Sequence, residues 1–330
     1  MNEVIRENRG LKKIIVFIFY PVVWIRRKYI HYRPIWLIKH RPKKMASALY
    51  KKAMGQELDW KNPKDLNAKI NWLKFYGDRA LWARCADKYA VRAYVEERGL
   101  GKLLVKLLGK WDRAEDIEWD KLPDKFILKM NNGSGTNYIC NDKNSVNTVG
   151  LTEKFHRWLN ISYASQYVEP HYGDIKPCVI AEELLDINDQ DITSSTLIDY
   201  KVWSFNGEPL YIWVCHNRGE KGPQVATFDT HWNFRPEKSV YNEHYRKSQI
   251  AIPKPKCLDE MLEAASTLSK GHPEVRVDFY VVGGKCYFGE MTFTSLGGYM
   301  DFYTKEMLLE MGEKTDLTLV RKKSNDTELL

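Results

Sequence analysis

The sequence of 330 residues predicts an α+β fold in which antiparallel sheets dominate. The first observation is a change of pattern near Leu122, where helical segments give way to short β-rich runs separated by Gly, Pro and Asn turns. The second is a pair of hairpin signals, Asn206-Gly207 and Gly283-Gly284, flanked by apolar and aromatic runs. The third is a composition with 44% hydrophobic residues, which is enough for a sizeable core. The length allows one large domain or two ordinary ones.

The first element in the chain is a basic and partly apolar segment, residues 1–44. Residues 1–52 hold 14 Lys and Arg against two Glu, whereas the rest of the chain holds 37 basic and 41 acidic residues. This distribution argues against nucleic-acid binding over the whole surface. The apolar run 14–25 (IIVFIFYPVVWI) reaches about 18 Å as a helix, short of the roughly 30 Å core of a bilayer. We expect residues 12–28 to lie on an anionic membrane surface; the alternative is a core helix with basic flanks.

The second region, residues 45–121, is predicted to be helical. Residues 45–55 and 80–99 carry helical patterns, and the latter run ends at Gly99, a typical C-terminal capping residue. Lys88 and Arg92 lie one turn apart on the second helix, either facing a ligand or forming an ordinary solvated face.

The third region, residues 122–315, is predicted to contain seven strands, with helices at 151–167 and 258–270. The strands are 126–130, 138–140, 178–185, 195–205, 209–216, 275–282 and 285–293. The polar residues 316–330 form a tail that we expect to fray.

A small-residue loop follows the first of these strands. Lys129 precedes Gly133, Ser134 and Gly135, which allow backbone N–H groups to approach an anion while the lysine supplies a charge for phosphate. No Walker A motif is present, so a simple glycine turn is the alternative.

Two further strands carry polar groups in positions that suit a nucleotide. Glu182 and Glu183 end a strand whose edge can hydrogen-bond a purine base, and acids beyond it can take ribose hydroxyls. Lys201 shares one strand face with Asp199 and Trp203, where it meets either a phosphate or solvent.

The Gly283-Gly284 hairpin has a carboxylate on each arm, Asp278 and Glu290. A two-residue turn would place Asp278 opposite Gly289 and point the two acids to opposite faces. A three-residue loop with a bulge would place Asp278 opposite Glu290, with Cβ atoms about 4.5–5.5 Å apart. Two carboxylates at that distance suit a magnesium ion, whereas solvated acids on an exposed hairpin are the alternative.

Taken in order, these motifs resemble the ATP-grasp superfamily, and specifically its TupA-like (teichuronopeptide biosynthesis type) proteins. The similarity runs from about Met45 to Tyr299 and rests on NPKDLNAKINWLKFYGD, ADKYAVRAYV, LPDKFILKMNNGSG, IAEELL, DYKVWSFNG and RVDFYVVGGKCYFGEMTF. It implies two α+β subdomains that grip ATP, and it makes the bulged three-residue loop the expected geometry of the hairpin.

The resemblance also implies roles for individual residues. Those implied to bind ATP are the phosphate lysines Lys88 and Lys129, the covering loop Gly133, Ser134 and Gly135, the adenine hinge Glu182, Glu183 and Leu185, and a ribose partner, Asp189 or Asp186. Those implied to act at the transferred group are Lys201 and Arg276, with Asp278, Glu290 and Thr292 for Mg²⁺. Thr292 stands where the family usually has Asn, and Ala68 and Cys178 stand where Glu and Arg are expected.

The implied activity is an ATP- and Mg²⁺-dependent carboxylate–amine ligase of bacterial cell-surface polysaccharide synthesis, joining an amino acid to a hexuronic acid. The six cysteines include no CxxC pair, which argues against zinc and predicts a reducing, cytosolic compartment. We therefore expect a cytoplasmic protein on the inner face of the plasma membrane. The alternatives are a glycosyltransferase using Asp189-Gln190-Asp191, an ATP-grasp sugar kinase, or a non-catalytic membrane scaffold.

Overall fold

The computed structural model describes residues 36–164 and 167–320, and the chain divides into two units, residues 1–49 and 50–330. The predicted membrane segment, residues 12–28, lies outside the described residues, as do residues 321–330 of the predicted tail. No helix in the two described ranges combines the length and the apolar character needed to cross a bilayer.

In the first unit, residues 36–40 are helical and α3 (Pro42–Met54) begins. The Ser47 hydroxyl donates a hydrogen bond of 3.0 Å to the carbonyl of Lys43, one turn earlier. Because α3 runs across residue 45, the predicted boundary at that residue falls inside a helix.

The second unit opens with three helices, α4 (Leu66–Tyr76), α5 (Arg79–Ala86) and α6 (Val91–Glu97). The single helix predicted over residues 80–99 is therefore wrong. Asp87 interrupts it, because its carboxylate accepts hydrogen bonds from the N–H groups of Tyr89 and Ala90 and forms a turn.

A four-stranded antiparallel sheet follows, with the strand order β1-β4-β2-β3. Its strands are β1 (Leu107–Trp111), β2 (Phe126–Met130), β3 (Asn137–Cys140) and β4 (Val179–Glu183). Helix α7 (Thr148–Leu159) covers one face through Leu151 and Phe155 and ends before the predicted residue 167. Strand β1 lies in the region predicted to be helical, so that prediction is wrong for these residues. The strand was not predicted because its mostly half-buried residues show no alternating pattern.

The second sheet has six strands in the order β10-β9-β5-β6-β7-β8. Its strands are β5 (Asp199–Phe205), β6 (Glu208–His216), β7 (Gln224–Asp229), β8 (Arg246–Lys247), β9 (Val275–Val282) and β10 (Lys285–Thr292). Only the β7–β8 pair is parallel among these described strands. All seven predicted strands are present, whereas β1, β7 and β8 were not predicted.

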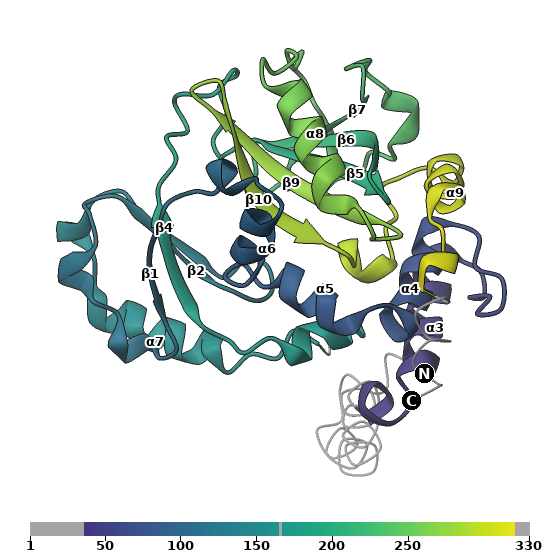
Figure 1. Cartoon of the computed structure of the whole chain (residues 1–330), viewed down its shortest axis with the longest axis horizontal. Helices are drawn as coiled ribbons and strands as arrows, with labels where there is room; N and C mark the ends of the chain where they lie inside the picture. Colours follow the sequence, from purple (N-terminus) through teal and green to yellow (C-terminus); the bar gives the residue numbers. More distant parts are fainter. Residues whose placement is uncertain (1–35, 165–166, 321–330) are drawn as a thin grey trace, which may run out of the picture. The chain divides into compact units, whose positions relative to one another are not determined.

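Helices cover this sheet on both faces (Figure 1). Helix α8 (Leu258–Ser269) packs on the face that carries Tyr200, Val202 and Phe279. On the other face, α4 and α9 (Lys305–Lys314) cover only the end around Trp203 and Phe205. The rest of that face is left for polar side chains, and it is turned toward the four-stranded sheet.

The two predicted hairpins differ in how they set the strand register. Asn206 and Gly207 have φ of 48° and 93°, and they join β5 to β6 as a two-residue turn, as predicted. Gly283 and Gly284, at φ 60° and 70°, also form a two-residue turn, so the predicted three-residue loop is wrong.

Asp278 nevertheless lies opposite Glu290, as expected, because the bulge sits within β10. The register shifts between Phe288 and Glu290, which leaves Gly289 as the extra residue. A Cβ at Gly289 would stand 3.0 Å from the Asp278 carbonyl oxygen, so glycine suits this crowded position. The bulge, and not the turn, brings the two acids together.

Candidate active site

A cavity of about 490 Å³ lies between the two sheets. Residues of the glycine loop and of β2 line one side, and residues of β5, β6, β9 and β10 line the other. The predicted residues that line it are Lys88, Lys129, Gly133, Ser134, Gly135, Lys201, Arg276 and Glu290. The structure thus gathers residues that are up to about 200 positions apart in the sequence, as the antiparallel topology requires.

Strand alternation aims the charged groups at this cavity. Asp199 and Lys201 on β5, and Arg276 and Tyr280 on β9, line it at intervals of two and four residues. Tyr200, Val277 and Phe279 point to the other face of the sheet and pack against α8. A one-residue slip of either strand would therefore bury the charges in the apolar core.

Asp278 organises two of the cations and is itself 1% exposed. Its carboxylate accepts hydrogen bonds of 2.7 and 2.8 Å from the Arg276 guanidinium and a third from the Lys201 ammonium. Lys201 also lies 3.3 Å from Asp199. Burial alone would lower the pKa of Lys201, but the two carboxylates outweigh it and raise that pKa.

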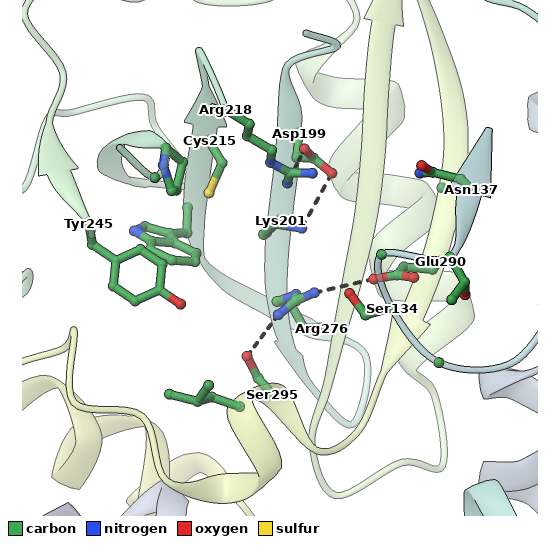
Figure 2. A pocket seen from close by; sticks show the side chains of 18 of the residues that line it. Ser134, Asn137, Asp199, Lys201, Cys215, Arg218, Tyr245, Arg276, Glu290 and Ser295 are labelled. Atoms are coloured by element: carbon green, nitrogen blue, oxygen red, sulfur yellow. Dashed lines mark hydrogen bonds and ion pairs between the residues drawn. The ribbon is translucent and has the colours of Figure 1, made fainter. Parts of the chain in front are cut away.

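Glu290 lies beside Arg276 and lines the cavity (Figure 2). Its oxygens are 3.3 Å from the Lys88 ammonium and 3.5 Å from the Arg276 guanidinium. Burial raises the pKa of Glu290, but Lys88, Lys201 and Arg276 together lower it to about 2. Glu290 is therefore a carboxylate at neutral pH.

Thr292 does not stand free as a ligand. Its hydroxyl accepts a hydrogen bond of 3.1 Å from Arg276 and donates one of 3.3 Å to Glu290. Arg276 also donates to the Ser295 hydroxyl at 2.7 Å, so the guanidinium is held on several sides (Figure 2).

Lys88 connects the glycine loop to the opposite sheet. Its ammonium donates to the Gly133 carbonyl at 2.8 Å, and its backbone N–H donates to the Asn131 carbonyl. Gly133 has φ of 72°, and a Cβ there would overlap the ring of Tyr163, so the loop requires glycine at this position.

A second cavity of about 720 Å³ continues from the first beside the end of β4. Glu183 and Leu185 of the predicted adenine hinge line it, and so does Asp186, one of the two predicted ribose partners. Glu182 lines it too, but its carboxylate is paired with Lys129 at 2.7 Å and with Arg92 at 3.0 Å.

Asp189, the ribose partner expected beside Asp186, is not among the residues that line this second cavity. Its carbonyl accepts a hydrogen bond of 2.7 Å from the N–H of Gly283 at the β9–β10 turn. Of the two candidates for the ribose, the structure brings Asp186 to the site.

Several residues of the site were not singled out from the sequence. Arg218 pairs with Asp199 beside Lys201, and Glu169, 8% exposed, lines a third cavity next to Arg276. Lys74 is buried beneath the turn Ser295–Gly298 and donates to the Gly297 carbonyl. The one local signal was on α4, where Asn67, Asn71 and Lys74 repeat at the spacing of a helix face.

The protein side chains alone do not complete a magnesium site here, and phosphate oxygens of a bound nucleotide would have to supply the remaining ligands. In the described part of the chain no three acidic, His or Cys residues gather as a complete metal site. Glu290 is 35% exposed toward the cavity, whereas both oxygens of Asp278 already accept from Arg276 and Lys201. Magnesium is commonly held by one or two carboxylates together with phosphate oxygens, and this arrangement suits that mode.

Two ligases of known structure are similar to parts of this chain. A D-alanine–D-alanine ligase from Bacillus anthracis is similar over 74% of this chain and 71% of its own, at 17% identity and a TM-score of 0.45. An L-amino acid ligase from Bacillus licheniformis is similar over 79% of this chain and 57% of its own, at 13% identity and a TM-score of 0.43. A search of curated protein sequences found no match.

The sequence itself matches the family model described as TupA-like ATP-grasp over residues 68–316. This range contains both sheets and all the residues that line the central cavity. The predicted α+β ATP-grasp fold is confirmed, and the chain belongs to the TupA-like ATP-grasp family.

Proposed function

We propose that this protein is an ATP- and Mg²⁺-dependent carboxylate–amine ligase that acts through an acyl phosphate. The observation that carries the proposal is one cavity lined by five cations, Lys88, Lys129, Lys201, Arg218 and Arg276, together with the carboxylate Glu290. This group of cations in a cavity of about 490 Å³, with a glycine loop beside it, suits the phosphates of a nucleotide.

The nucleotide occupies the two continuous cavities. The base lies in the larger one, against the end of β4 at Glu183 and Leu185, and Asp186 takes a ribose hydroxyl. Lys129 is shared by both cavities, so it meets the phosphates where the two join.

Each charged residue then has a defined task at the transferred group. Lys88 and Lys201 bind phosphate oxygens, while Arg276, fixed by Asp278 and Ser295, holds the acyl phosphate in line with its carboxylate. The loop Gly133–Gly135 closes over the nucleotide and excludes water that would hydrolyse the intermediate.

Glu290 would hold the magnesium ion, and Asp278 would be its second carboxylate ligand if phosphate took over the contact with Lys201. A magnesium ion supplies charge neutralisation on the phosphate oxygens during the transfer. Thr292 stays a weaker candidate, because its hydroxyl is engaged with Arg276 and Glu290.

The carboxylate substrate is a hexuronic acid of a bacterial cell-surface polysaccharide precursor, and the amine is an amino acid. The far wall of the central cavity supports this choice, because it carries Trp213, Tyr245 and Phe302. The indole N–H of Trp213 is buried without a hydrogen-bond partner among the described residues, which leaves this wall with one unsatisfied donor. Residues 12–28 hold the protein on the anionic cytoplasmic face of the membrane.

The test is ATP turnover with Mg²⁺, a panel of uronic-acid sugars and amino acids, and hydroxylamine as a trap. We expect ADP, phosphate and a hydroxamate on one sugar, all lost in Asp278→Ala and Glu290→Ala variants that remain folded by circular dichroism. Normal turnover in both variants would remove the metal assignment.

Other products would identify the alternatives. ADP without free phosphate, with phosphate left on the sugar, would indicate a sugar kinase. ATP untouched over the whole panel, with UDP released from a sugar nucleotide, would indicate a glycosyltransferase.

A further inference from the structure

A third cavity, of about 420 Å³, opens beside the reaction centre on the side away from the nucleotide base. It shares Gly133, Ser134, Arg276 and Glu290 with the central cavity. A molecule bound here would face the same Arg276 that is assigned to the acyl phosphate.

One carboxylate, Glu169, forms part of the wall of this cavity and is 8% exposed. The Thr294 hydroxyl donates a hydrogen bond to its Oε1. No hydrogen bond from a described residue reaches its Oε2. Oε2 keeps contact with solvent, so a ligand in this cavity can donate a hydrogen bond to it.

The nearest cation cannot satisfy that oxygen. Lys74 attracts Glu169 electrostatically, yet its three N–H bonds are committed to the carbonyls of Tyr167 and Gly297 and to the side chain of Asn71. Burial raises the pKa of Glu169, and the charge of Lys74 opposes that rise. Burial lowers the pKa of Lys74 to about 7, so Lys74 balances the charge of Glu169 only in part, and it makes no hydrogen bond to the Glu169 Oε2 atom.

Aromatic rings form the other walls. Tyr163, Tyr167 and Tyr172 line the cavity around Glu169. A Cβ on Gly133 would overlap the Tyr163 ring, and one on Gly297 would lie 2.3 Å from Tyr167, so two glycines make room for these side chains. Rings around a carboxylate recognise an ammonium group, through cation–π attraction and a charge-assisted hydrogen bond.

The backbone before Glu169 is strained, which indicates that its position is imposed. Val168 has φ of 57°, a left-handed conformation that a β-branched residue rarely adopts. Val168 is 3% exposed, so the packed core around it maintains this conformation. Strain of this kind is concentrated at ligand-binding sites.

We propose that this third cavity is the site of the amine substrate, and that Glu169 binds its amino group. The proposal rests on the proposed ligase function and specifies where the second substrate enters. The carboxylate substrate then approaches Arg276 from the aromatic wall of the central cavity. The amine approaches the resulting acyl phosphate from the side of Glu169.

The proton balance follows from these positions. The ammonium group passes one proton to the Glu169 carboxylate and becomes a neutral amine. Its nitrogen forms the bond to the acyl carbon as the carbon–oxygen bond to phosphate breaks, and its second proton leaves with the phosphate. Glu169 later returns its proton to solvent.

The test measures amine binding directly by saturation-transfer NMR, with each proteinogenic amino acid as the probe and with AMP-PNP and Mg²⁺ present. We expect the wild-type full-length chain to bind at least one amino acid, and Glu169→Gln to bind it at least about tenfold more weakly. Tyr163→Leu removes one wall without touching the buried Lys74–Glu169 pair and should also weaken binding. Glu208→Gln, at an exposed carboxylate paired with Lys314, is the matched control and should bind as the wild type does.

Equal binding by the wild type and Glu169→Gln, or no amino acid bound by the wild type, would overturn the assignment. If Glu169→Gln does not fold, Tyr163→Leu decides, and unchanged binding in that variant would overturn it as well. The hydroxylamine trap separates this proposal from the ligase function itself. A wild type that forms hydroxamate but binds no amino acid contradicts this proposal alone, whereas a wild type that forms no hydroxamate contradicts the ligase function.

Discussion

Glu274 is a fully buried carboxyl group for which no described residue supplies a hydrogen bond to either oxygen. Burial raises its pKa well above the ordinary value of 4.5, although Arg276 opposes the rise. Above the ordinary glutamate pKa of 4.5, the folded protein therefore holds this proton more tightly than the unfolded chain, which releases it. Folding stability consequently falls as the pH rises above the ordinary glutamate value, because the folded state must retain a proton that the unfolded state has lost.

Replacing Glu274 with Gln should remove this dependence on pH. The free energy of unfolding of Glu274→Gln relative to the wild type should increase between about pH 5 and pH 8, by at most about 1.4 kcal/mol per pH unit. Urea unfolding at several pH values measures the difference. The exposed Glu208→Gln serves as the control, and a difference that stays flat with pH would show that Glu274 is ionised in the folded state.

Arg276 shows what a single residue does at the centre of the site. It contacts Asp278, Ser295, Thr292 and Glu290, which belong to two strands and the turn that follows β10. From the sequence, Arg276 was named only through the family resemblance, as a residue that acts at the transferred group. Ser295 was not predicted, because no local pattern connects it to an arginine 19 positions earlier.

At the scale of elements, α4 is a support for the turn beneath Arg276. Asn67 and Asn71 donate to the carbonyls of Met300 and Gly298, and Lys74 donates to that of Gly297. The turn itself is strained, with Leu296 at φ 45° and two glycines after it at 64° and 74°. The polar face of α4 satisfies carbonyls that would otherwise be buried without donors, and so it fixes Ser295 against Arg276.

Asn71→Ala tests this support. The variant leaves the Gly298 carbonyl without its donor and should lose about 1–3 kcal/mol of unfolding free energy. We also expect slower ATP turnover, because the turn that positions Ser295 is loosened. Chemical denaturation and the turnover assay measure both effects.

The matched change Asn62→Ala lies at an exposed asparagine just before α4 and should alter stability by no more than about 0.5 kcal/mol. If Asn71→Ala and Asn62→Ala have equal stability and turnover, α4 has no part in holding the turn.

At the scale of the whole molecule, charge separates the N-terminal segment from the rest of the chain. The net charge of +8 arises from residues 1–52, and the remainder is slightly acidic. A basic and apolar segment next to an acidic body favours contact with anionic lipid through the segment alone.

We therefore expect the full-length protein to bind vesicles that contain phosphatidylglycerol and to lose binding at high salt. Each cation near the surface contributes about 1 kcal/mol, so replacing Lys12, Lys13, Arg26, Arg27 and Lys28 with Gln should abolish sedimentation with the vesicles. Five Lys-to-Gln changes at exposed lysines of the acidic body serve as the control. Vesicle binding that survives the first set and fails with the second would place the membrane contact on the body of the protein.

The sequence by itself determined seven of the ten described strands and the positions of the two hairpins. Period-two alternation on β5 and β9, and the Asn-Gly and Gly-Gly turns, are local signals that each segment contains on its own. Lys129 and Lys201 were singled out from such local patterns, whereas the role of Arg276 came from the family resemblance.

Only the tertiary structure decided which of these groups meet. Gly289 reads in the sequence as one more strand residue, yet the bulge there is what places Glu290 opposite Asp278. Glu169 and Thr294 are 125 positions apart, and Lys74 and Gly297 are 223 apart, so no local period records either contact. Such contacts form because folding brings polar groups that are distant in the sequence into the same buried region. There each group needs a hydrogen-bond partner from the protein or from a ligand.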